Sequence, residues 1–113
     1  MERMARIYIL EPEAEVRDLL VRVAERLGYE ALEYDVSAPP EIVEGDVLVV
    51  EPSDPPSLAA AVDVHERVPN VEIVCVSVYS SLPEEVALEP RAFVVKPFRL
   101  EELEQALREA IEG

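Results

Sequence analysis

The residues of this chain that are best suited to chemistry each end or directly follow a short apolar run. Glu11 follows MARIYIL, Glu51 follows DVLVV, Ser77 ends VEIVCVS, and Lys96 follows RAFVV. A carboxylate can accept a transferred group or hold a cation, while an ammonium and a hydroxyl group can bind an anion. Whether these side chains act together depends on the elements that position them.

The hydrophobic pattern predicts strands that alternate with helical segments along the chain. Strands are expected at residues 4–10, 29–34, 46–50, 71–77 and 91–95. Helices are expected from about Pro12 to a C-cap at Gly28, from an N-cap at Ser57 to Val68, and from Leu100 to Ile111. The segments SAPPEIVEG (37–45) and LPEEVALEP (82–90) leave room only for short second and fourth helices.

This alternation favours an α/β fold with a doubly wound, five-stranded parallel sheet and helices on both faces. We expect one domain that spans residues 1–113. The carboxyl ends of parallel strands lie at one edge of such a sheet, which is where ligands bind. Glu11, Glu51, Ser77 and Lys96 are therefore expected along the same edge.

The composition argues against several classes of function. Asp and Glu number 25 against 10 Lys and Arg, for a formal net charge of −15 at pH 7. Such a surface repels phosphate backbones and anionic lipids, so we expect no direct binding to nucleic acids or membranes. No apolar run is long enough to span a bilayer, which favours a cytoplasmic protein. The single Cys75 excludes an intramolecular disulfide. Thr and Trp are absent, Asn and Gln occur once each and Pro occurs 10 times, a mix that is typical of a heat-adapted protein.

Four segments of the chain are similar to the receiver domain of two-component response regulators (CheY-like). They are YILEPEAEVRDLL, DVLVVEPSDPP, IVCVS and VVKPF, and the likeness covers nearly the whole sequence. The resemblance implies a flavodoxin-like fold and places Glu51 at the position of the phosphoacceptor. It implies phosphoryl contacts by Ser77 and Lys96, a switching aromatic at Phe93, and a cis bond before Pro97.

The chain departs from the receiver pattern where phosphotransfer chemistry would occur. Glu51 stands in place of the phosphoacceptor Asp, and Glu11 with Pro12 stands in place of an acidic pair. Pro12 offers no side-chain oxygen, and Glu13 is one position too far along to substitute for it. We therefore expect a degenerate acidic pocket (Glu11, Pro12, Glu13), no Mg²⁺ site, no other cofactor and no catalytic residue, so the chain is not expected to be an enzyme.

Three interpretations of Glu51 follow. It is a fixed charge that mimics a phosphorylated receiver with Lys96 and Ser77 as partners, or a salt-bridged relic, or an inefficient phosphoacceptor. The first two carry equal weight and more than the third. They predict a stand-alone pseudo-receiver that acts in trans on another signalling protein such as a kinase, regulator or output protein. A homodimer is compatible with this prediction.

A different class of function, a small flavodoxin-like cofactor-binding enzyme, is disfavoured by the loops. The chain contains only Gly28, Gly45 and Gly113, and none of them lies in a phosphate-cradling loop after a predicted strand. Copurified flavin or nucleotide would favour this alternative.

Overall fold

A single parallel sheet forms the centre of the molecule. The computed structural model describes residues 4–113. Its strands are β1 (Arg6–Leu10), β2 (Glu30–Glu33), β3 (Val47–Val50), β4 (Glu72–Ser77) and β5 (Ala92–Val95). They pair in parallel in the order β2-β1-β3-β4-β5. This is a doubly wound order, so the predicted α/β fold class is confirmed.

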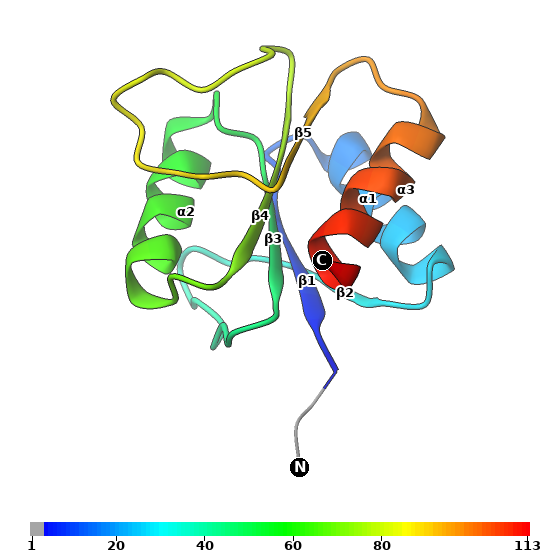
Figure 1. Cartoon of the computed structure of the whole chain (residues 1–113), viewed down its shortest axis with the longest axis horizontal. Helices are drawn as coiled ribbons and strands as arrows, with labels where there is room; N and C mark the ends of the chain where they lie inside the picture. The colour runs from blue at the N-terminus through cyan, green and yellow to red at the C-terminus, as the bar shows by residue number, and fades with distance from the viewer. Residues whose placement is uncertain (1–3) are drawn as a thin grey trace.

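Helices cover both faces of the sheet (Figure 1). They are α1 (Ala14–Arg26), α2 (Pro55–Arg67) and α3 (Leu100–Glu112). Alternate strand residues such as Ile9 and Val49 pack with α1 and α3, while Leu10 and Val50 pack with α2. No helix within residues 4–113 has the length and apolar character needed to cross a bilayer.

The prediction of short second and fourth helices is wrong. Residues 37–45 and 82–90 form turns and irregular backbone in the structure. Proline lacks an amide donor and restricts the residue before it, and each segment contains two prolines. A single helical turn also costs more backbone entropy than its few hydrogen bonds return. Both segments are held by apolar anchors instead, since Ile42 and Leu88 are buried.

The start of α2 also differs from the prediction, because Asp54 and not Ser57 is the N-cap. Asp54 Oδ2 accepts hydrogen bonds from the backbone N–H of Ser57 at 3.1 Å and from its hydroxyl at 2.6 Å. Pro55 and Pro56 occupy the first helical positions, where their fixed φ favours the helix and their missing N–H groups cost nothing. The helix therefore begins earlier than the apolar spacing alone indicated.

We expect Asp54→Ala to lower the free energy of unfolding by about 1 kcal/mol, because it removes the side-chain acceptor of the α2 N-terminus. Asp63→Ala is a matched control, since Asp63 is an exposed Asp of the same helix. The control should cost about 0.5 kcal/mol or less. Urea denaturation of the two variants checks this, and equal losses would contradict the role of Asp54 as the cap.

A buried carboxylate that the sequence pattern did not reveal lies just before β3. Asp46 is fully buried, although the apolar run had suggested that it was part of the strand. Its two oxygens accept hydrogen bonds from the backbone N–H groups of Arg6 and Val43, each at 3.0 Å. Asp46 thus ties the segment before β3 to the start of β1, at the edge of the sheet opposite the carboxyl ends of the strands.

Candidate functional site

Three charged side chains meet at the carboxyl edge of the sheet. Lys96, directly after β5, places its Nζ 2.7 Å from Glu11 Oε1 and 3.1 Å from Glu51 Oε1. Glu11 follows β1 and Glu51 follows β3, so residues far apart in the sequence converge here. The Glu11 and Glu51 side chains are 1% and 6% exposed, and that of Lys96 is 16% exposed. The site is therefore a nearly buried ion cluster in which one ammonium group joins two carboxylates.

The remaining oxygen of each carboxylate is also engaged. Glu11 Oε2 accepts a hydrogen bond from the backbone N–H of Glu13, and Glu51 Oε2 accepts one from the backbone N–H of Ser53, each at 3.2 Å. Both glutamates thus fold back onto the amide two residues further along the chain. Ser53 was not among the site residues predicted from the sequence, because its contribution comes from the backbone and no side-chain pattern signals it.

The two carboxylates keep Lys96 protonated. Burial alone lowers the pKa of Lys96, but the hydrogen bonds and charges of Glu11 and Glu51 outweigh it, so the pKa lies above its ordinary value of 10.5. At neutral pH the cluster consequently retains a full positive charge on Lys96. The ammonium group of Lys96 is thus charged and paired on two sides.

Ser77 lies beside the ion cluster but does not join it. The Ser77 hydroxyl accepts a hydrogen bond from the backbone N–H of Tyr79 at 3.3 Å, and the Ser77 carbonyl accepts one from the backbone N–H of Lys96 at 2.7 Å. Within residues 4–113, the hydroxyl makes no hydrogen bond to Glu51 or Lys96. Of the two partners expected for a phosphate-mimicking Glu51, the structure therefore supplies Lys96 only.

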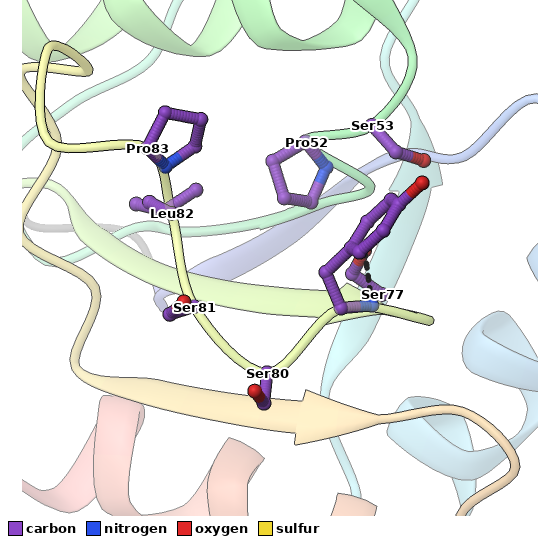
Figure 2. A pocket seen from close by; sticks show the side chains of 8 residues that line it. Pro52, Ser53, Ser77, Ser80, Ser81, Leu82 and Pro83 are labelled. Carbon is purple, nitrogen blue, oxygen red and sulfur yellow. Dashed lines mark hydrogen bonds between the residues drawn. The ribbon is translucent and has the colours of Figure 1, made fainter.

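A cleft of about 500 Å³ opens next to Ser77 (Figure 2). Ser53 and Pro52 from the β3–α2 loop form one side, and the segment after β4, including Ser80 and Pro83, forms the other. Hydroxyl groups and proline rings line the cleft, and no cationic side chain among residues 4–113 does so. The described lining therefore contains no charge that could bind a phosphate strongly.

The other residues of the predicted site lie outside the ion cluster. Phe93 on β5 is half-buried and packs on the α2 face of the sheet. Pro12 is exposed, and Glu13 contributes its backbone N–H while its side chain is exposed. The Lys96–Pro97 peptide bond is cis, which confirms the expectation drawn from the family resemblance.

The residues at this edge do not fit a divalent cation. Mg²⁺ requires near-octahedral oxygen coordination, usually from carboxylates and waters. Here the Lys96 ammonium lies between the two carboxylates, and both of their outer oxygens accept backbone hydrogen bonds. Pro12 adds no ligand. No cluster of three or more His, Cys, Asp or Glu side chains within residues 4–113 is arranged to hold a metal ion.

Cys75 lies inside β4 and is fully buried. Burial, with a contribution from the charge of Glu51, raises the pKa of the Cys75 thiol to about 12. The thiol is therefore protonated at neutral pH and out of reach of solvent. A buried, protonated thiol of this kind is an inert core residue.

The fold is that of known receiver domains, although the sequence matches no protein-family model and no curated protein. A response regulator receiver domain protein (CheY-like) from Methanospirillum hungatei superimposes with a TM-score of 0.77 over 97% of this chain and 95% of its own, at 17% identity. The chemotaxis protein CheY4 of Vibrio cholerae gives 0.75 over 96% and 99%, at 17% identity. The response regulator TrrA of Thermotoga maritima, solved with Mg²⁺ and BeF, gives 0.75 over 95% and 99%, at 20% identity. The chain therefore has the CheY-like receiver fold.

Proposed function

We propose that this chain is an atypical receiver module in two-component signalling that works through protein contacts without phosphorylation of Glu51. The observation that carries the proposal is the double contact of Lys96 Nζ with Glu11 and Glu51. A single ammonium group contacts both carboxylates, which supports a role for this edge that requires neither a metal ion nor a phosphoryl group. The protein would act in the cytoplasm on a separate signalling protein and would catalyse no reaction.

The environment of Glu51 argues against its use as a nucleophile. Both of its oxygens accept hydrogen bonds, and its side chain is 6% exposed. A carboxylate attacks a phosphodonor only when an oxygen is free and aligned, and misplacement by about 1 Å can cost about 10²-fold in rate. The ammonium of Lys96 would also have to leave Glu51 in order to bind an incoming phosphoryl group.

A slow phosphoacceptor remains the second candidate, and the cleft beside Ser77 favours it. Ser53 and Ser77 line this cleft, and the Ser53 backbone N–H contacts Glu51. A small phosphodonor in the cleft would therefore lie close to the Glu51 carboxylate. This candidate requires rupture of the Glu51–Lys96 contact, which the first candidate does not.

Incubation with Mg²⁺ and acetyl phosphate, followed by intact-mass measurement, tests the proposal. We expect no phosphoadduct on the wild-type chain. Glu51→Gln is the matched control, since it retains the size of the side chain but cannot form an acyl phosphate. A hydroxylamine-sensitive adduct that forms on the wild type and is absent from Glu51→Gln would overturn the proposal in favour of the slow phosphoacceptor.

A further inference from the structure

An apolar groove of about 570 Å³ runs along α2, on the face of the sheet away from α1 and α3. Leu58, Ala59 and Val62 line one wall, at the helical spacing that places them on one side of α2. Val86 and Ala87 form the other wall. We call this feature the α2 groove.

The α2 groove exists because the segment between β4 and β5 forms no helix. Figure 1 shows this segment, residues 78–91, as irregular backbone on the same side of the sheet as α2, and we call it the strap. Leu88 anchors the strap in the core, whereas Val86 and Val62 are only partly buried. The strap therefore covers α2 incompletely and leaves apolar side chains open along one side of the helix.

The rim of the α2 groove is acidic. Asp63, Glu66 and Glu85 border it. Asp63 pairs with Arg67 at 3.0 Å, but Glu66 and Glu85 form no ion pair among residues 4–113. An apolar floor with unpaired carboxylates at its edge complements a ligand that is apolar on one side and cationic at its margins.

We infer that the α2 groove binds a basic amphipathic helix of a partner protein. The partner's apolar residues would pack between Val62 and Val86, and its lysine or arginine side chains would lie against Glu66 and Glu85. Helix-in-groove recognition uses anchors at this spacing. The inference rests on the proposed function, which holds that the chain acts through a partner protein. It adds which surface of the chain binds that partner and what chemistry the partner has.

Charge argues against other occupants of the α2 groove. A second copy of this chain carries the same net charge of −15, and its helix α3 has glutamates along its exposed side. Two such surfaces repel one another at close range. Nucleic acids and anionic membranes are repelled for the same reason.

A synthetic helix composed only of leucine and lysine, of the same length as α2 (13 residues), is a suitable probe. Its binding to the full chain is measured by fluorescence anisotropy. We expect Ala59→Arg to weaken binding by about tenfold, because it places a bulky cation in the groove and opposes the lysines of the probe. Ala59 is exposed, so the substitution leaves the core intact.

Gln105→Arg is the matched control. Gln105 is exposed on α3, across the sheet from the groove, and its substitution changes the net charge by the same amount as Ala59→Arg. We expect it to alter the affinity by less than about twofold. Equal weakening by both arginine variants would overturn the inference, because attraction by net charge alone would then explain binding. Absence of binding to the wild type would overturn it too.

This experiment separates the inference from the proposed function. The probe reports on α2, whereas the phosphodonor experiment reports on Glu51. A phosphoadduct on Glu51 would overturn the proposed function without changing the anisotropy result. Failure of the probe to bind the α2 groove would overturn the inference but would not bear on whether Glu51 is phosphorylated. A leucine–glutamate helix of the same pattern should show no binding, and binding equal to that of the lysine probe would contradict the charge argument.

Discussion

Lys96→Met should lower the free energy of unfolding at neutral pH by about 3–5 kcal/mol, the loss observed when one partner of a buried ion pair is removed. The reason is the geometry of the ion cluster, in which Lys96 Nζ is the cation shared by Glu11 and Glu51. Methionine approximates the shape of the lysine stem but leaves both carboxylates buried without a counter-charge. Urea denaturation followed by circular dichroism measures the difference.

A variant without charges in the ion cluster distinguishes the effect of unpaired buried carboxylates from the effect of altered side-chain packing. Glu11→Gln, Glu51→Gln and Lys96→Met together remove all three charges, and replacement of a whole buried ion cluster is often nearly neutral. We therefore expect this triple variant to be more stable than Lys96→Met alone. If Lys96→Met lowered the free energy of unfolding by less than about 1 kcal/mol, the ion cluster would contribute no more than an ordinary surface salt bridge, which would contradict the prediction.

The pH dependence of the Lys96 contribution has a definite sign. The pKa of Lys96 is raised in the folded protein, so its stabilising effect is fully present below the ordinary value of 10.5. The effect is lost as the pH rises through the higher folded value. The difference between wild type and Lys96→Met should accordingly be constant near neutrality and shrink at strongly alkaline pH. A difference that stays constant to high pH would contradict a charge-based contribution.

Glu51→Asp combined with Pro12→Asp should make the protein respond to Mg²⁺, whereas we expect no such response from the wild type. The first substitution shortens the side chain by one methylene, so its carboxylate would withdraw from Lys96 Nζ, which Glu51 reaches at 3.1 Å. The second substitution would add a carboxylate beside Glu11. Carboxylate oxygens with bound waters are the ligands that Mg²⁺ prefers. Saturating Mg²⁺ should then raise the free energy of unfolding by about 1–3 kcal/mol through linkage, as measured by urea denaturation with and without the ion.

Each single substitution serves as a control for this double variant, and Gln105→Glu controls for the addition of a remote carboxylate. None of the three should respond to Mg²⁺ as the double variant does. The double variant also provides a positive control for the acetyl phosphate experiment, because it restores the residue types expected in a working receiver. Equal stabilisation of wild type and double variant by Mg²⁺ would contradict the view that Pro12 and the length of Glu51 disable metal binding.

The ion cluster bears on how Glu51 relates to a phosphorylated receiver. A phosphoryl group brings nearly two charges and three acceptor oxygens, whereas a carboxylate brings one charge. Lys96 divides its contacts between Glu51 and Glu11, and the Ser77 hydroxyl accepts a hydrogen bond from the Tyr79 backbone N–H. This geometry favours a salt-bridged structural role for Glu51 over close mimicry of a phosphoryl group.

The apolar runs and their spacing were sufficient to predict the sheet and the helices that flank it. Continuous apolar runs such as VEIVCVS indicate strands that are buried on both faces. Because these strands alternate with segments of helical spacing, few sheet topologies are compatible with the sequence. Because parallel strands end at one edge, the sequence also predicted that Glu11, Glu51 and Lys96 would lie along it. Local signals failed where prolines mattered, at the N-cap of α2 and in the two segments that form no helix.

The sequence by itself thus determined the order of the elements, the edge at which the charged residues gather, and the two positions, Glu51 and Pro12, that differ from the receiver pattern. Only the tertiary structure decided that Lys96 contacts both glutamates, that the Ser77 hydroxyl bonds to the Tyr79 backbone instead, and that a groove with an acidic rim lies open beside α2. The physical reason is that the two kinds of feature depend on different separations. Hydrophobic periodicity involves residues that are close in sequence, so it can be recognised in the sequence alone. Ion pairing and groove shape depend on distances of a few ångströms between residues that are far apart in the chain.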